Sequence, residues 1–303
     1  MRLCDAALLV TGEAFVMTRL SSEAPGQRPV FIRRPGGLQM GENQYVWRSG
    51  AIDVATARLE QLERSLDPAT YGRLDRIGVP RGGRCWEIGA GRGTTALFLL
   101  AKCGLGEVVA TDIDVQWLDQ IRHPCLQVRH HDVVTDDLDD LGMFDLIHAR
   151  LVIHHLGVER GAIAVERAAS RLNPGGVLFL EEPIDLNRSA RHHPEAESFE
   201  RLAGAVFDFL TTYGLDLNCG LQLPHMLRTL GLIDVDSELS GSVTHGGDPL
   251  RTALRMTVEV SRATVPYDSI LGGHTDDLLR LHDDPDLDLV PFIVAGAWGR
   301  RPH

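Results

Sequence analysis

The fold of this chain is decided by the stretch Arg84-Cys-Trp-Glu87-Ile-Gly89-Ala-Gly91-Arg-Gly93-Thr-Thr95. The stretch predicts a buried strand that ends in an acid, breaks into a glycine loop and enters a helix. Glycines at alternate positions permit positive φ angles and let a ligand approach the backbone directly. Free N–H groups in such a loop, before a helix N-terminus, favour a bound ligand. We therefore expect a nucleotide-type cofactor here, although a glycine triplet alone does not identify it.

Strand and helix patterns alternate after this loop, and one of the expected helices covers residues 115–122. Each predicted strand is a short apolar run, as expected for a parallel sheet buried on both faces, and each ends in a polar residue. These residues are Glu87, Asp112, Asp132, Arg150 and the pair Glu181 and Glu182. The alternation predicts an α/β fold with a doubly wound, mostly parallel sheet of seven strands, counting two late strands near the C-terminus. Ligands of such sheets bind beyond the carboxyl ends of the strands.

The flanking regions predict additions to this sheet domain. We expect an irregular arm over residues 1–40 and a helical segment over 41–78, in which Asp67-Pro68 starts a second helix. Residues 79–303 then form the main domain, with a helical insertion after the fifth strand, over about 188–221, as a substrate cap. Upstream of the first helix, Tyr45 and Trp47 either plug the domain or close over a cofactor.

Composition limits the partners. The net charge is −12 and no run of Lys or Arg appears, which disfavours nucleic acid as a ligand. The five cysteines are scattered without a C-x-x-C pair, and no apolar run is long enough to span a membrane. We therefore expect a cytoplasmic protein with no nucleic-acid or membrane partner and no metal, and leave a homodimer open.

The ligand of the glycine loop has two interpretations on physical grounds. Asp112 follows the loop at the interval at which an acid accepts hydrogen bonds from a ribose diol, which both nicotinamide and other nucleoside cofactors present. Asp132 can accept from the exocyclic amine of adenine. The glycines alternate, however, and do not follow the G-x-G-x-x-G spacing of a dinucleotide site. The spacing and Glu87 together favour a cofactor other than NAD.

A family resemblance makes this preference specific. The segments that carry it are Glu87-Ile-Gly89-Ala-Gly91-Arg-Gly93-Thr, Thr111-Asp112-Ile-Asp114, His131-Asp132, Phe144-Asp145-Leu-Ile-His148-Ala-Arg150-Leu-Val-Ile-His154-His155-Leu and Leu172-Asn-Pro-Gly-Gly176. In this order and spacing the chain resembles class I S-adenosylmethionine-dependent methyltransferases over about residues 80–185. It is most similar to the small-molecule methyltransferases of actinobacterial secondary metabolism. Residues 1–40 lie outside the resemblance.

The resemblance implies S-adenosylmethionine as cofactor and a set of residues that hold it. In that set the glycines approach the methionine part, Asp112 binds the ribose, Asp132 and the backbone of Val133 bind adenine, and Ala149 and Arg150 lie near the methionine amine and carboxylate. The expected cofactor-binding residues are Glu87, Gly89, Gly91, Gly93, Asp112, Ile113, Asp132, Val133, Ala149 and Arg150.

Methyl transfer is an in-line displacement that requires alignment and, for a hydroxyl or acidic carbon, a base. The candidates that follow strands four and five are His154, His155, Glu181 and Glu182. Period-2 alternation predicts that Glu181 and Glu182 point to opposite faces, so that one of them faces substrate. The histidine pair is alternatively a packing feature. The acceptor is expected to be a small apolar or aromatic metabolite under the cap, beside Phe207 and Leu210. Two other functions stay open, a non-catalytic cofactor-binding protein and an NAD-dependent oxidoreductase.

Overall fold

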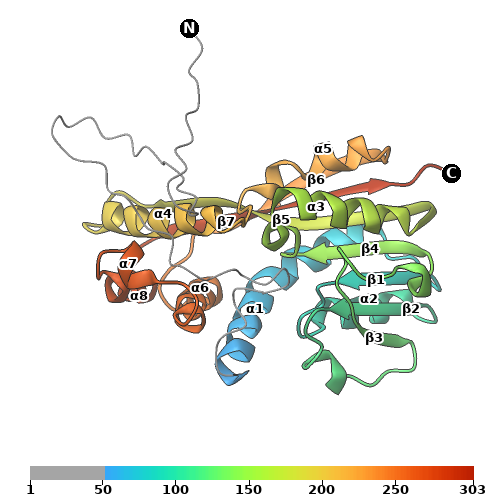
Figure 1. Cartoon of the computed structure of the whole chain (residues 1–303), viewed down its shortest axis with the longest axis horizontal. Helices are drawn as coiled ribbons and strands as arrows, with labels where there is room; N and C mark the ends of the chain where they lie inside the picture. Colours follow the sequence, from blue (N-terminus) through green and yellow to red (C-terminus); the bar gives the residue numbers. More distant parts are fainter. Residues whose placement is uncertain (1–51) are drawn as a thin grey trace, which may run out of the picture. The chain divides into compact units, whose positions relative to one another are not determined.

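The computed structural model describes residues 52–303, so the predicted arm over 1–40 and the positions Tyr45 and Trp47 lie outside the described residues. A seven-stranded sheet runs through this part of the chain (Figure 1). Its strands are β1 (Arg84–Ile88), β2 (Glu107–Asp112), β3 (Leu126–His130), β4 (Phe144–Arg150), β5 (Leu172–Ser189), β6 (Ile233–Ser240) and β7 (Leu289–Arg300). The strand order is β3-β2-β1-β4-β5-β7-β6, and β7 alone runs antiparallel to its neighbours. The predicted doubly wound, mostly parallel sheet is confirmed.

Helices cover both faces of the sheet and also form a separate group near its end. They are α1 (Ile52–Ile77), α2 (Thr94–Cys103), α3 (Ile153–Ser170), α4 (Ala196–Thr212), α5 (Leu223–Thr229), α6 (Pro249–Ser261), α7 (Tyr267–Ile270) and α8 (Thr275–Asp283), with the single turns η2 (Leu118–Gln120), η3 (Asp139–Leu141) and η4 (Cys219–Leu221). No helix within residues 52–303 is long and apolar enough to cross a membrane.

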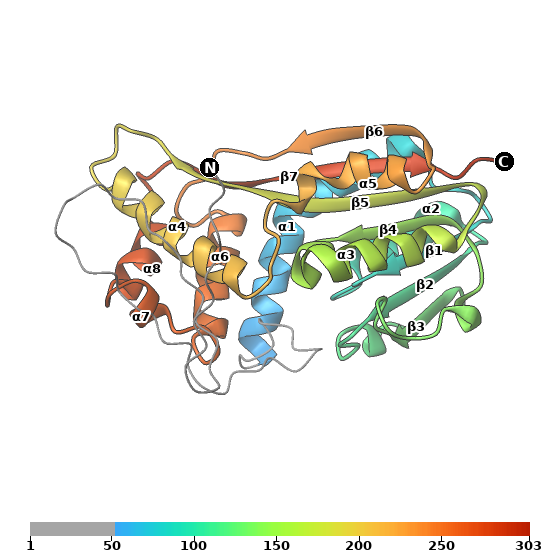
Figure 2. The same ribbon diagram turned by 45° about the horizontal axis from the view of Figure 1, so that its top comes forward.

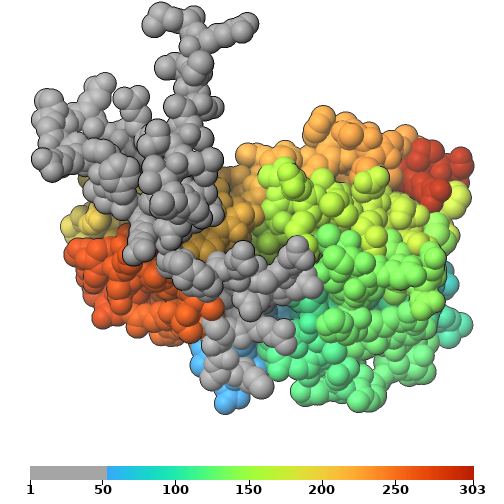
Figure 3. All heavy atoms as spheres, viewed as in Figure 1, coloured from blue at the N-terminus to red at the C-terminus, as the bar shows by residue number. Residues whose placement is uncertain are grey.

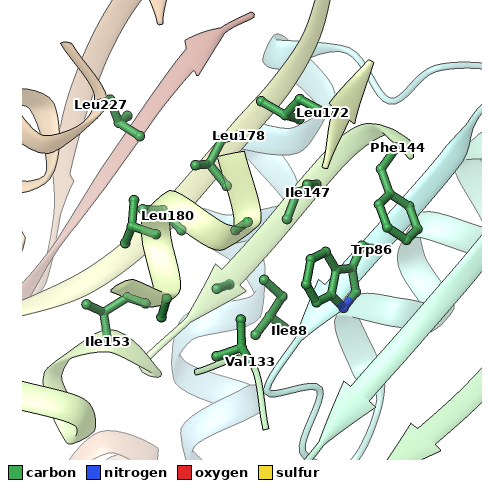
Figure 4. Close-up of a cluster of buried hydrophobic side chains, with 14 of the residues drawn as sticks. Trp86, Ile88, Val133, Phe144, Ile147, Ile153, Leu172, Leu178, Leu180 and Leu227 are labelled. Carbon is green, nitrogen blue, oxygen red and sulfur yellow. The ribbon is translucent and has the colours of Figure 1, made fainter. Parts of the chain in front are cut away.

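Within residues 52–303, an apolar core lies against each face of the sheet. The first holds Trp86, Phe144 and Ile147 from the strands together with residues of α3 and α5 (Figure 4). The second joins the opposite face of the strands to α2 and to Leu74 of α1. Both faces of the central strands are therefore buried, which explains why these strands read as continuous apolar runs and not as alternating patterns.

Strands β5 and β7 form a ribbon that extends past the parallel strands. Their antiparallel pairing runs from Val177 opposite Arg300 to Ser189 opposite Leu289, whereas β4 pairs with β5 only as far as Glu181. The helices α4, α6, α7 and α8 gather around the extended end of this ribbon (Figure 2). In the space-filling view the deep-orange atoms of the α6–α8 region lie at the left, and the green atoms of β3 and β4 lie at the right (Figure 3).

Two predicted helices differ from the structure. The predicted restart at Asp67-Pro68 is wrong, because α1 continues through Pro68 to Ile77. The helix predicted over residues 115–122 is reduced to the turn η2. There the carboxylate of Asp112 accepts from the N–H of Asp114, and that of Asp114 from the N–H of Gln116. Such local side-chain bonds compete with helical hydrogen bonding.

Candidate active site

A cavity of about 430 Å³ opens at the carboxyl ends of the parallel strands and continues under the helices of the ribbon. Its sheet side is lined by the glycine loop after β1 and by the segments that follow β2, β3 and β4. Its other walls come from α1, α4, α6, α7 and α8. The volume lies within the range of small-molecule and cofactor sites.

The glycine loop shapes one wall of this cavity. Gly89 has a φ of 65°, and a Cβ on it would lie 2.3 Å from Cγ2 of Val152, so only glycine fits between the loop and α3. Gly91 has a φ of 54°, and a Cβ built on it meets no atom within 4 Å. The space above Gly91 is therefore open to a ligand, as expected for a backbone cradle. Gly93 precedes α2 and lies outside the cavity lining.

Two carboxylates at the ends of β2 and β3 line the same cavity. Asp112 accepts from the N–H of Gly91 at 2.8 Å and from that of Asp114 at 2.9 Å, which fixes the acid against the glycine loop. Burial raises the pKa of Asp112 above its usual range. Asp132 accepts from the N–H of Val134 at 2.8 Å. Each carboxylate oxygen can accept a further bond, so both acids retain capacity for a ligand. Ile113 and Val133 also line the cavity.

Beneath the glycine loop lies a network of buried charges. His148 of β4 is fully buried, with Nδ1 at 2.7 Å from Oε2 of Glu87 and Nε2 at 3.2 Å from Oε2 of Glu181. These carboxylates overcome the effect of burial and raise the pKa of His148 to about 9. Hydrogen bonds to His148 and Thr70 lower the pKa of Glu181 to about 2 despite its burial. The imidazolium therefore bridges two strands that flank β4.

Side chains of α1 bind the buried network and line the cavity. The sequence patterns did not predict this contribution of α1 to the site. Arg73 donates to Oε1 of Glu181 at 2.5 Å, and Arg150 donates to Oδ1 of Asp67 at 2.7 Å. Glu63 lies 3.0 Å from Arg92 of the glycine loop and lines the cavity. Burial raises the pKa of Glu63 to about 7, against the opposing effect of Arg92. Polar residues on a predicted amphipathic helix carry no signal that would distinguish them from a solvated face.

His154 stands between the sheet edge and the cap helices, and Glu182 orients it. Glu182 is fully buried and accepts from the N–H groups of Val152 at 2.8 Å, Ile153 at 2.7 Å and His154 at 3.2 Å. Its Oε2 also lies 2.8 Å from Nδ1 of His154. A carboxylate that satisfies the first N–H groups of a helix is an acceptor, so Nδ1 of His154 carries the proton. The lone pair is then on Nε2, and His154 lines the cavity.

His155 lies beside His154, with ring centroids 3.7 Å apart. Burial and the neighbouring His154 and Arg58 hold the pKa of His155 well below its ordinary value. His155 is therefore a neutral group in the cavity wall.

Of the remaining predicted site residues, Glu181, Glu182 and Ala149 lie away from the cavity and Arg150 lines it. Glu181 and Glu182 point to opposite faces, as the period-2 rule predicts, but both are fully buried and neither lines the cavity. This differs from the expectation that one of them would face substrate, because both are consumed by internal hydrogen bonds. Ala149 is also buried outside the lining. Arg150 does line the cavity, with its guanidinium bound to Asp67 and Thr70.

The cap wall is formed by more of the chain than the predicted segment over residues 188–221. Phe207 and Leu210 of α4 line the cavity as expected. α6 and α8, which are distant in sequence, supply the facing wall with Leu254, Leu278 and other side chains. Within residues 52–303, no group of three or more His, Cys, Asp or Glu side chains is arranged to hold a metal ion.

Comparison with known proteins identifies the sheet domain. Residues 86–178 match the family described as "Methyltransferase domain". The match spans β1 to β5 and includes the glycine loop, both acids and His154. The chain carries a class I methyltransferase domain. The cofactor of this domain class is S-adenosylmethionine.

Two solved structures, each with a TM-score of 0.50, support the fold of this methyltransferase domain. A putative methyltransferase from Bacillus halodurans superposes with a TM-score of 0.50 at 16% identity, covering 78% of this chain and 100% of that one. The YcgJ protein from Bacillus subtilis superposes with a TM-score of 0.50 at 14% identity, covering 78% of this chain and 99% of that one. The similarity to Haemonchus contortus phosphoethanolamine N-methyltransferase 2 covers 82% of this chain but only 53% of that protein, at 16% identity and a TM-score of 0.44. The chain therefore spans about half the length of that protein. No curated protein matches the sequence significantly.

The residues at the glycine loop fit S-adenosylmethionine. The open space above Gly91 accommodates a ligand against the backbone. Asp112 and Asp132 supply acceptors suited to hydroxyl and amine donors. Carboxyl groups, Asp112, Asp114 and Asp132 among them, outnumber guanidinium groups in the lining of this end, which suits a cationic sulfonium.

Proposed function

We propose that this protein transfers a methyl group from S-adenosylmethionine to a small, largely apolar or aromatic molecule of secondary metabolism. The observation that carries the proposal is the continuity of one cavity from the acidic glycine-loop end to an apolar chamber under the cap. His154, in the first turn of α3, lines the same cavity, and its backbone oxygen accepts from the N–H of Asp216 in the segment after α4. Such an arrangement suits a cofactor at one end and an acceptor at the other.

In this proposal the first end of the cavity holds the cofactor. Glu87 supports the loop from below, Gly89 and Gly91 provide the cradle, and Gly93 sets the start of α2. Asp112 accepts from the ribose hydroxyls, and Asp132 with the backbone of Val133 binds adenine. Ile113 packs beside the nucleoside, Ala149 supports the wall from within the sheet, and Arg150 with Asp67 borders the methionine part. When bound, the cofactor supplies an electrophilic methyl group on a sulfonium.

His154 is the proposed general base. Its Nε2, the ring nitrogen that does not contact Glu182, takes the proton from a hydroxyl or other acidic group of the acceptor in this proposal. Glu182 is the positioning residue, since it fixes the tautomer and orientation of the ring without lining the cavity. We assign His155 to the cavity wall as a neutral group and Glu181 to the buried network. The cap helices exclude water from the acceptor.

Two measurements test the function. Calorimetry with S-adenosylhomocysteine should detect binding to the full chain, and NAD should give no signal; binding of NAD alone would overturn the cofactor assignment. Incubation of the protein with labelled S-adenosylmethionine and fractionated small-molecule extracts should yield a labelled product that is heavier by one methylene group. Cofactor binding without any labelled product, from chemically diverse fractions, would favour a non-catalytic protein.

A further inference from the structure

The ribbon of β5 and β7 contributes a polar pair of side chains to the wall of the cavity. Asp185 and Asn187 of β5 both line the cavity, as does Phe292 of β7, which is paired with Asp185. Directly opposite residues of an antiparallel pair project to the same face, so the carboxylate lies beside an aromatic ring. Asp185 follows Glu182 by about 10 Å along the strand, so the pair is separate from the acid that orients His154.

An irregularity in the ribbon brings Asn187 to the side of Asp185. The register of β5 against β7 shifts between Asp185 and Arg188, where two residues of β5 oppose Pro291 alone. Such a β-bulge suits a proline, which has no N–H to donate to the ladder, and it redirects side chains. Asn187 in the bulge has a φ of 43°, a left-handed conformation that Asn tolerates better than most residues. Its side-chain amide donates to Oδ1 of Asp185 at 2.6 Å.

The pair offers the cavity two acceptor oxygens. Because a carboxylate only accepts, the amide nitrogen of Asn187 faces Asp185 and its Oδ1 is directed elsewhere. Among residues 52–303, neither this oxygen nor Oδ2 of Asp185 has a hydrogen-bond partner, and neither is enclosed by protein. Both residues are half-buried and line the cavity, so a ligand there can reach them. Two neighbouring acceptors select a group that donates more than one hydrogen bond.

The charge of Asp185 selects a cation. No side chain of the described residues forms an ion pair with Asp185, and the neighbouring Arg188 pairs with Glu200 at 3.6 Å. Burial raises the pKa of Asp185 to about 6, so the carboxylate is ionised near neutral pH at a cost in stability. A carboxylate held at a cavity wall without a cation is typical of a ligand site. An ammonium group would supply both the charge and the donors.

We propose that Asp185 and Asn187 bind a protonated amine of the acceptor, whose apolar or aromatic body lies against Phe292 and Phe207. The inference rests on the proposed function and adds the substrate class to it. Phe207 of α4 lines the same cavity. An ammonium has no lone pair with which to attack the cofactor, so it anchors the acceptor while another atom receives the methyl group. The acceptor is thus an amine with an apolar body and a separate reactive group.

The test uses two probes with the same biphenyl body, 4-phenylbenzylamine and 4-phenylbenzyl alcohol. Each is titrated calorimetrically at neutral pH into the full chain saturated with S-adenosylhomocysteine, so that no turnover occurs. The wild-type protein should bind the amine about tenfold or more tightly than the alcohol, the effect of a charge-assisted hydrogen bond. Asp185→Asn should bind both probes equally and keep its affinity for the alcohol. Asp208→Asn, which removes an exposed acid of α4 whose charge also acts on Asp185, is the matched control and should retain the preference.

A second variant and thermal unfolding separate binding from a structural role. Asn187→Gly keeps a residue that accepts positive φ and removes the amide oxygen, so it should lose part of the preference for the amine. Asp185→Asn should unfold at the wild-type temperature or above it, because burial disfavours the carboxylate. A lower unfolding temperature together with weaker binding of both probes would show that the carboxylate serves the fold, and would overturn the proposal.

Three further binding results would overturn the inference: equal affinities in the wild type, an unchanged preference in Asp185→Asn, or no binding of either probe. Failure of S-adenosylhomocysteine to bind in the saturation step is a different result, because it would overturn the proposed function together with the inference that rests on it.

Discussion

Glu182 orients His154, the proposed base. Its carboxylate accepts the N–H groups of Val152, Ile153 and His154 and the Nδ1–H of His154. Because the helix start and the imidazole share one acceptor, the ring is oriented by the same bonds that begin α3. A single buried acid thus links local folding to the position of the proton on His154.

The substitution Glu182→Gln tests this link. The amide oxygen can still accept from the N–H groups of Val152 and Ile153, but its NH₂ would face the N–H and Nδ1 of His154 and favour the other tautomer. We expect methyl transfer to fall by about a hundredfold or more, as the reversed tautomer does in serine proteases. Affinity for S-adenosylhomocysteine should stay the same.

The exposed Glu197→Gln on α4 is the control for Glu182→Gln and should leave the rate unchanged. Turnover by Glu182→Gln at the wild-type rate would mean that His154 does not act as the base.

Asp112 should contribute directly to cofactor affinity. Asp112→Ala removes the acceptor for the proposed ribose hydroxyls and the bond to the N–H of Gly91. We expect affinity for S-adenosylhomocysteine to weaken by about 1–3 kcal/mol, measured by calorimetry. The exposed Asp119→Ala serves as the control. An unchanged affinity would require a different position for the ribose.

At the scale of elements, the glycine loop and α3 determine each other's position. Gly89 contacts Val152 at the start of α3, whereas Gly91 faces open space. Both adopt positive φ, so any side chain strains the backbone at either position. Only at Gly89 does a side chain also collide with a neighbouring element.

Alanine substitutions should separate these two effects. Gly91→Ala should lower the free energy of unfolding by about 1 kcal/mol and weaken S-adenosylhomocysteine binding by filling the cradle. Gly89→Ala should lower the free energy of unfolding by about 2–4 kcal/mol, because the collision with Val152 adds to the backbone strain.

The double substitution Gly89→Ala with Val152→Ala tests the cause. Removing the Val152 methyl groups should recover part of the stability lost in Gly89→Ala, as measured by urea unfolding. If the stability losses of Gly89→Ala and Val152→Ala simply add in the double variant, the collision with Val152 is not what destabilises Gly89→Ala.

At the scale of the whole described chain, buried charges tie α1 to the sheet. Glu181 of β5 accepts from Thr70 and Arg73 of α1, and Arg150 of β4 donates to Asp67 of α1. His148 completes the network from β4. Burial of so many charges is favourable only while each retains its partners, so the network specifies one docking geometry for α1.

This network predicts a pH dependence of stability. The folded-state pKa of His148 is raised from 6.5 to about 9, so the protonated ring stabilises the fold fully below pH 6.5 and loses this effect as the pH rises through 9. We expect the free energy of unfolding to fall by about 1–3 kcal/mol between pH 6.5 and 9.5, measured with urea.

His148→Gln is the control for the pH experiment. It should be less stable by about 3–5 kcal/mol at pH 7, because Glu87 and Glu181 lose their shared cation, and it should lack the slope. If the free energy of unfolding of His148→Gln depended on pH as it does in the wild type, the pH dependence would come from another group.

The sheet, the glycine loop and the acids that follow β2 and β3 could be predicted from the sequence. These features are local: an apolar run, a glycine spacing and a polar residue at a strand end each act within a few residues. The same reasoning failed at residues 115–122, where the short-range bonds of Asp112 and Asp114 replace helical bonds, and at Pro68, where α1 continues.

The tertiary structure alone decided which polar side chains face the cavity. Glu181 and Glu182 follow one another in sequence, yet their partners come from α1 and β4 on one face and from α3 on the other. Glu63 and His282 reach the cavity from opposite ends of the described chain. The physical reason is that hydrogen bonds and burial depend on contacts between distant segments, and no periodicity or spacing within one segment encodes them.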